Sequence, residues 1–94
     1  MAQDVIALKL ATGEEVIGRV EYNDAQTLQL SKVRVVVIQP MANQQVGVGF
    51  MPFMACSPDG IIPLNKASIV AEVRPNTDME KAYLQQTSSI KLMG

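Results

Sequence analysis

The chain has 94 residues, a net charge of −1 from eight basic and nine acidic side chains, and 48% hydrophobic residues. This length predicts one domain over residues 1–94 with a single hydrophobic core. No run of basic residues gives the positive footprint that strong electrostatic nucleic-acid binding needs. The chain lacks histidine, which excludes His-based catalytic triads and the commonest metal ligand. We therefore expect no enzyme activity, no metal and no cofactor.

The stretch from residue 6 to residue 30 has the period of β-strands. Apolar residues recur at every second position with charged residues between them, which is typical of strands that place one face on a core. Gly13 can supply the positive φ of a short hairpin turn, and Asp24 is suited to open a second turn. Gly18 predicts a bend or a close backbone approach. We expect three antiparallel strands, the second strongly bent, with these side chains inside: Ile6, Leu8, Leu10, Val16, Val20, Tyr22, Leu28 and Leu30.

The next segment, residues 33–38, is apolar on both faces, so it is either buried on both sides or covered by a partner. Pro40 ends it, because proline lacks a backbone N–H donor. Residues 41–44 are expected to form a loop. Residues 45–56 are expected to form another strand, and Pro52 favours an edge or bulge position for its second half.

The last part of the sheet and the C-terminal helix have clear boundaries. Residues 57–60 form a strong turn signal, Ser-Pro-Asp-Gly. A short apolar strand, a polar corner at residues 65–67 and a final strand over residues 68–73 follow. After Pro75, Thr77 with Glu80 three positions later resembles a capping box, so we expect a helix over about residues 77–88. Its apolar stripe is expected to contain Met79, Ala82, Tyr83, Gln86 and Ile90.

Cys56 is the only cysteine, so an intramolecular disulfide is impossible and a reducing compartment is expected. Its apolar surroundings favour a small buried side chain over a reactive thiol. The first residues do not have the pattern of a signal peptide, and no apolar run reaches membrane-spanning length. We expect a soluble, cytoplasmic protein with no membrane partner and no small-molecule substrate.

Five or six short strands and one helix in so short a chain predict an all-β fold with one terminal helix. The expected architecture is a small, strongly bent, five-stranded antiparallel barrel over about residues 4–74, of the Sm-like or SH3-like type, followed by the C-terminal α-helix.

The opening stretch also resembles the first sequence motif of the Sm-like (LSm) family. The matching residues are Leu8, Thr12, Gly13, Val16, Gly18, Val20, Asp24, Leu28, Gln29 and Leu30. They cover about a quarter of the chain. The segment from residue 14 to residue 20 is also similar to small Sm-like proteins encoded by tailed phages.

The resemblance implies single-stranded RNA binding by a closed ring of barrels whose edge strands pair, as in RNA chaperones and RNA-processing proteins. We expect a homo-oligomeric ring of five to seven subunits, because ring closure leaves no open strand edge. The expected oligomer interface contains Val35, Val36, Val37, Ile38, Val48, Phe50 and Met51.

The resemblance places the RNA-binding residues in two loops. They are expected at Asp24, Gln26, Thr27, Asn65 and Lys66. The chain departs from the family here: the family's base-stacking aromatic or histidine and its base-reading asparagine are replaced by polar residues, and the glycine after the basic residue is replaced by alanine. The helix is C-terminal, whereas the family normally has it at the N-terminus.

Each of these residues also has a simpler interpretation. Asp24 can cap its own turn, Gln26 and Thr27 can be solvated loop residues, and Lys66 can be a solvated corner. Arg34, which lies among valines, is expected to pair with a carboxylate across an interface. Met41, Met51 and Met54 are expected in core or interface packing. The alternative function is therefore a homo-oligomeric interaction or scaffold module that keeps the barrel and has lost RNA binding.

Overall fold

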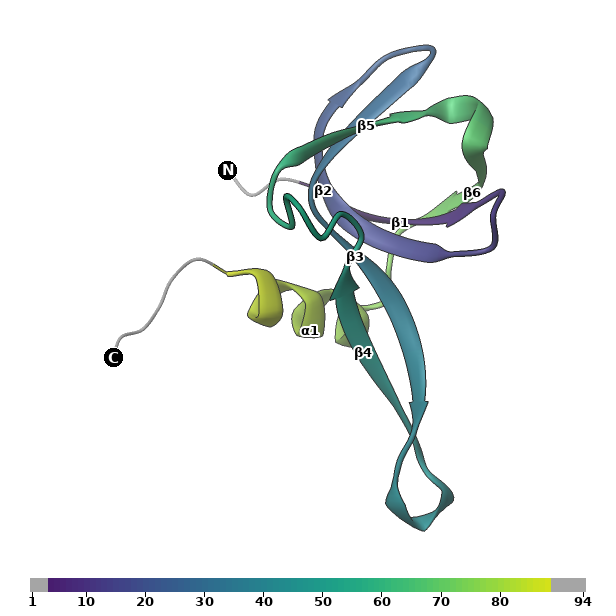
Figure 1. The fold of residues 1–94 in the computed structure, drawn as a ribbon, viewed down its shortest axis with the longest axis vertical. Coiled ribbons are helices and arrows are strands. Elements are labelled where there is room, and N and C mark those ends of the chain that lie inside the picture. Colours follow the sequence, from purple (N-terminus) through teal and green to yellow (C-terminus); the bar gives the residue numbers. More distant parts are fainter. Residues whose placement is uncertain (1–3, 89–94) are drawn as a thin grey trace.

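The computed structural model describes residues 4–88 and shows an antiparallel β-sheet followed by one helix (Figure 1). The first three strands and the C-terminal helix form where the sequence predicted them. The elements are β1 (Val5–Leu10), β2 (Glu15–Asn23), β3 (Thr27–Pro40), the 3₁₀ turn η1 (Ala42–Gln44), β4 (Val46–Pro52), β5 (Ile61–Asn65), the 3₁₀ turn η2 (Lys66–Ser68), β6 (Ile69–Val73) and α1 (Thr77–Thr87).

The sheet has the strand order β4-β3-β2-β1-β6, and β5 pairs with β3. Strand β3 is long enough for two partners: residues 27–31 pair with β5, and residues 34–40 pair with β4. The two halves diverge in space (Figure 1). The first half curves with β1, β2, β5 and β6 around a common centre, and the second half projects with β4 as a two-stranded hairpin. No backbone hydrogen bonds pair β5 with β6 within residues 4–88, so the sheet is open and does not close into a hydrogen-bonded barrel.

The six strands lie within the expected range of five or six, although the expected barrel had five. The strand expected over residues 45–56 is shorter than predicted, because β4 ends at Pro52 and a turn-rich segment over residues 53–60 separates it from β5. At the start of this segment, the backbone N–H of Phe53 donates to the carbonyl oxygen of Val33 at 3.1 Å, so the chain folds back over β3. The chain thereby passes from the projecting hairpin back to the curved part of the sheet.

The inner face of the curved strands carries the main core. Its buried members are Leu8, Leu10, Val16, Leu28, Leu30, Val33 and Leu64, with Ile6 and Val20 packed against them. The inward alternation predicted for the first three strands is therefore confirmed for most positions. Tyr22 is the exception, because its side chain is 52% exposed. It lies beyond a register shift between β2 and β3, where the regular alternation of the pair is interrupted.

A second, smaller core lies where α1 covers the sheet. Tyr83 of α1 packs with Val5 and Ile17, and all three are buried. The ring of Phe50 meets the Tyr83 ring edge-on, with 6.2 Å between the centroids. The helix therefore packs on β1, β2 and the base of the hairpin. Ile90, which was expected in its apolar stripe, lies outside the described residues.

Two glycines have the roles that the sequence predicted. Gly13 has a φ of 104°, which the turn between β1 and β2 requires. A Cβ atom on Gly18 would lie 3.2 Å from Cβ and Cδ1 of Leu30, closer than ordinary van der Waals contact. Gly18 therefore allows β2 to pack directly against the buried Leu30 side chain.

Two local predictions are wrong. The N-cap of α1 is Asn76, whose Oδ1 accepts from the backbone N–H of Met79 at 2.9 Å, so Thr77 is the first helical residue and not the cap. Cys56 is exposed, because the turn-rich segment carries it away from both cores. Across residues 4–88, no helix has the length and apolar character needed to cross a membrane.

Candidate nucleic-acid interface

The two loops that the sequence singled out lie side by side. The backbone N–H of Lys66 donates to the carbonyl oxygen of Gln26 at 2.9 Å. Thr27 and Asn65 are paired residues at the ends of β3 and β5. All five predicted RNA-binding residues therefore belong to one continuous surface, although about forty positions separate the two loops in the chain.

Asp24 organises the first loop. One carboxylate oxygen accepts hydrogen bonds from the backbone N–H groups of Gln26 and Thr27, both at 2.8 Å. The Asp24 backbone N–H donates to the Thr27 carbonyl oxygen at 2.9 Å, which closes the turn. The capping role considered from the sequence is therefore confirmed.

The second loop is held by Asn65 in the same way. Its side-chain oxygen accepts from the backbone N–H of Ala67 at 2.9 Å and caps the 3₁₀ turn η2. The capped turn fixes the backbone of Lys66, whose side chain is half-buried. Both loops are thus set by short side-chain caps, and the side chain of Gln26 is exposed between them.

The electrostatics of the surface are mixed. The backbone N–H groups of Gln26 and Thr27 hold the pKa of Asp24 below its ordinary value of 3.8, and the positive charge of Lys66 acts in the same direction. Asp24 is therefore ionised at neutral pH. The surface therefore offers Lys66 as a cation that could hold a phosphate, beside a carboxylate that opposes phosphate binding.

The expected oligomer interface maps to the projecting hairpin and its base. Cross-strand pairing places Val36 opposite Phe50 and Ile38 opposite Val48, so these four side chains share one face. Val36 and Phe50 pack under α1, whereas Ile38 is 65% exposed. Strands β3 and β4 contain no charged side chain from residue 35 onward, so the hairpin has none of the charges that usually protect an exposed strand edge.

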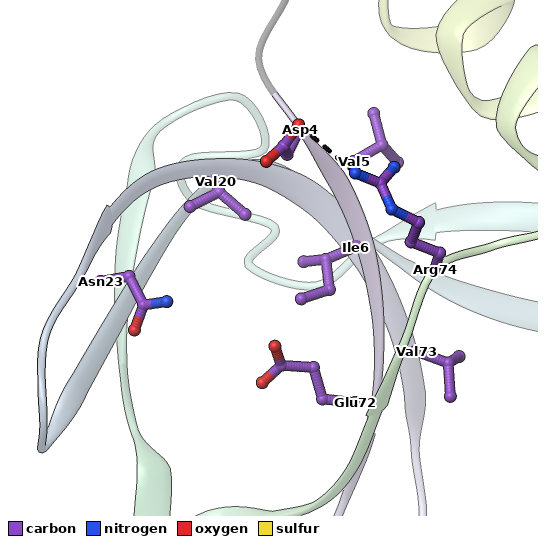
Figure 2. Close-up of a pocket in the computed structure, with 8 residues that line it drawn as sticks. All are labelled: Asp4, Val5, Ile6, Val20, Asn23, Glu72, Val73 and Arg74. Atoms are coloured by element: carbon purple, nitrogen blue, oxygen red, sulfur yellow. Dashed lines mark ion pairs between the residues drawn. The ribbon is translucent and has the colours of Figure 1, made fainter.

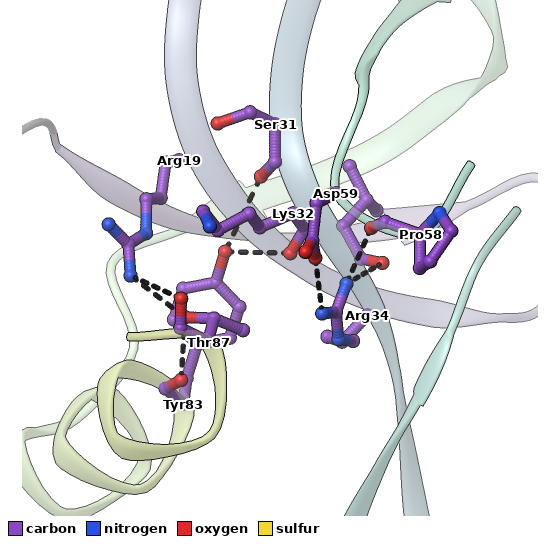
Figure 3. A network of polar contacts seen from close by, with 9 residues as sticks. Arg19, Ser31, Lys32, Arg34, Pro58, Asp59, Tyr83 and Thr87 are labelled. Carbon is purple, nitrogen blue, oxygen red and sulfur yellow. Dashed lines mark hydrogen bonds and ion pairs between the residues drawn. The ribbon is translucent and has the colours of Figure 1, made fainter. Parts of the chain in front are cut away.

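Arg34 does pair with a carboxylate, but the partner is in the same chain. Its guanidinium group donates to Asp59 Oδ1 at 2.7 Å and to the Pro58 carbonyl oxygen at 2.6 Å. The hydrogen bond from Arg34 holds the pKa of Asp59 below 3.8. Figure 3 shows this contact beside the Tyr83 network. Arg34 thus ties the turn before β5 to β3, where an interface pair was expected.

The sequence reasoning missed the polar network that anchors α1 (Figure 3). Arg19 on β2 donates to Thr87 Oγ1 at 2.9 Å, and its Cζ atom lies 5.8 Å from the centroid of the Tyr83 ring. The Tyr83 hydroxyl donates to the Lys32 carbonyl oxygen at 2.7 Å. The sequence signal that could have indicated this network is an arginine on β2 together with a tyrosine and a threonine one turn apart on the helix.

No group of three or more metal-ligating side chains occurs among residues 4–88. Comparison with known proteins adds no identification. No protein-family model matches this chain, and no curated protein matches it significantly.

Proposed function

We propose that this chain is an Sm-like protein that assembles into a homo-oligomeric ring and binds single-stranded RNA at the paired loops. The observation that carries the proposal is the Gln26–Lys66 backbone hydrogen bond, which brings together the two loops that the resemblance assigned to RNA. Both loops have capped, preorganised backbones and present amide groups and a lysine, which are suited to base edges and phosphate.

The strand order supports a barrel of the Sm-like type. In the curved part of the sheet the order is β5-β3-β2-β1-β6, and the short turn η2 joins the two outermost strands. This connection keeps β5 and β6 close in the chain at the point where a barrel would close. Because neither strand pairs on its outer side within the described residues, both outer edges offer backbone groups to neighbouring subunits.

A ring also compensates for the weak charge of one subunit. Each subunit contributes one Lys66 at the loop pair, and a ring of five to seven subunits repeats this cation around one rim. Binding then depends on many weak phosphate contacts, so affinity should fall as salt increases. Neither loop contains an aromatic side chain, so the loop residues themselves provide no base stacking.

The test is fluorescence anisotropy with labelled oligouridine and oligoadenosine decamers at low salt. We expect micromolar or tighter binding, and we expect Lys66→Ala and Gln26→Ala to weaken it. Lys66→Ala should also reduce the slope of log affinity against log salt concentration by about 1 for each phosphate that the lysine neutralises in the wild type. Lys81→Ala removes the same charge from the exposed face of α1 and should leave the affinity unchanged. No binding of either decamer at low salt would contradict RNA binding.

A second candidate is a ring-forming scaffold without RNA affinity. It is favoured by the ionised Asp24 carboxylate beside Lys66, which lowers the attraction for phosphate. The exposed, uncharged hairpin also fits a protein partner better than a nucleic acid. A mass of five to seven subunits by light scattering, combined with no RNA binding, would favour this candidate.

A further inference from the structure

A cavity of about 280 Å³ opens between β1, β2 and β6, next to the paired loops. Figure 2 shows Asn23 at the end of β2 and Glu72 on β6 directed into it from opposite walls. Ile6 and Val20 contribute apolar wall between them. The cavity therefore has mixed walls, with apolar side chains beside polar ones, and two of the polar side chains converge in it as they do in small-ligand sites.

The two polar side chains are available to a ligand. Neither the Asn23 amide nor the Glu72 carboxylate makes a side-chain hydrogen bond or ion pair with another residue of the described chain. By contrast, Asp4 and Arg74 at the rim face each other, with 3.8 Å between Oδ1 and the guanidinium nitrogen. That exposed pair largely offsets its own charge, so the Glu72 carboxylate sets the net charge of the cavity.

An uncompensated carboxylate decides which part of a nucleotide fits. It repels phosphate and accepts hydrogen bonds from N–H groups, so the cavity favours a neutral base that presents donors. The apolar walls at Ile6 and Val20 suit the face of a flat ring. A base therefore fits this site better than a sugar or a phosphate group.

Among the four RNA bases, guanine matches a carboxylate best. Its N1–H and N2–H donors are adjacent and parallel, so both can donate to one carboxylate in a bidentate pair. Uracil offers one N–H between two carbonyl oxygens that the carboxylate would repel. Adenine and cytosine each offer an amino group beside an acceptor nitrogen. We propose that this cavity binds a guanine base, with Glu72 accepting from N1–H and N2–H and Asn23 donating to the opposite edge.

The position of the cavity connects it to the RNA site, and in that respect this inference rests on the proposed function. Glu72 also lines a second hollow of about 240 Å³ that contains Lys66. Asn23 directly precedes Asp24, the first residue of the loop pair. A strand whose phosphate lies at Lys66 can therefore place the adjoining base in the cavity.

The first experiment compares three labelled RNA decamers: ten uridines, the same strand with one central guanosine, and the same strand with inosine there. We expect guanosine to tighten binding about 5- to 100-fold, as one bidentate base contact does. Inosine lacks the N2 amino group and should show a much smaller gain. Glu72→Gln should abolish the preference for guanosine without weakening oligouridine binding, because it removes a negative charge from the hollow that contains Lys66. Glu15→Gln makes the same charge change on β2, away from the cavity lining, and should keep the preference.

The outcomes separate this inference from the proposed function. Oligouridine binding without a guanosine gain, or a gain that persists in Glu72→Gln, would overturn the guanine site and leave RNA binding standing. If no RNA binds, NMR titrations with free guanosine and, separately, with free uridine test whether the cavity binds a base. Guanosine-specific shifts of the Asn23 and Glu72 amide signals would support the cavity as a base site although the RNA function had failed. The absence of such shifts would overturn it.

Discussion

The hydroxyl group of Tyr83 donates a 2.7 Å hydrogen bond to the carbonyl oxygen of Lys32, at the point where β3 changes direction. Lys32 has a φ of 51°, in the left-handed region. The register with β2 shifts there: Ile17 pairs with Arg34, but Arg19 pairs with Ser31. This β-bulge separates the half of β3 that pairs with β5 from the half that projects with β4. The helix therefore holds the bend that sets the direction of the hairpin.

Removing the Tyr83 hydroxyl should destabilise this bend. In Tyr83→Phe, the ring still fills the second core, but the Lys32 carbonyl oxygen no longer has its donor. We expect a decrease of about 1–2 kcal/mol in the free energy of unfolding, measured by urea denaturation. A matched control is Tyr22→Phe, because the Tyr22 side chain is half exposed and its change should cost much less. Equal decreases in the two variants would contradict the anchoring role of Tyr83.

The same tyrosine should make stability fall at alkaline pH. Burial raises the pKa of the Tyr83 hydroxyl above its ordinary value of 10.0. Above pH 10 the unfolded chain releases this proton while the folded chain retains it, so stability decreases as pH rises from 10 toward the folded pKa. Because lysines titrate in the same range, the measurement is the difference between the wild type and Tyr83→Phe. The difference in unfolding free energy between the wild type and Tyr83→Phe should become smaller above pH 10. A difference that stays constant would contradict the raised pKa of Tyr83.

The left-handed conformation at Lys32 predicts which substitutions the bulge accepts. A β-branched side chain is strained at positive φ, whereas asparagine adopts this region readily. We expect Lys32→Val to lower stability by about 1–2 kcal/mol and Lys32→Asn to be nearly neutral. Thermal unfolding of the two variants measures the contrast. If Lys32→Val unfolds at the same temperature as Lys32→Asn, the bulge does not adopt this backbone in solution.

Adding one methyl group at Gly18 should disturb the main core. The new Cβ would lie 3.2 Å from two side-chain atoms of Leu30, which is fully buried and cannot move without repacking. We expect Gly18→Ala to destabilise by about 1–3 kcal/mol in urea denaturation. Gly49→Ala is the control, because its Cβ would meet only the end of the flexible Gln39 side chain. A larger destabilisation by Gly49→Ala would reverse the expected order.

The projecting hairpin predicts self-association. An isolated two-stranded hairpin is marginally stable in water, and the exposed Ile38 and Val48 side chains leave one of its faces uncovered. We expect an oligomer by light scattering at tens of micromolar protein, and smaller particles for the double variant Ile38→Lys, Val48→Lys. The variant Gln85→Lys, Gln86→Lys adds the same charge to exposed positions of α1 and should leave the mass unchanged. A wild-type monomer, or an unchanged mass in the hairpin variant, would contradict this interface.

The sequence by itself determined the inner face of the sheet and the local turns. Alternating apolar residues from Leu8 to Leu30 define which side is buried, because side chains on a strand point to opposite faces. The turn at Gly13 and the cap at Asp24 depend only on residues close in the chain, so local chemistry was sufficient. Local chemistry also predicted both loops of the candidate RNA site as turns, whereas their assignment to RNA came from the resemblance to the Sm-like family.

Only the tertiary structure decided how these parts meet. The burial of Val5 and Ile17 depends on α1 covering the other face of the sheet, and the helix begins 60 or more positions further along the chain. The hydrogen bond between Gln26 and Lys66, the bulge at Lys32 and the cavity between Asn23 and Glu72 likewise join distant segments. Periodicity records which face of an element is apolar, but it carries no information about which distant element covers that face.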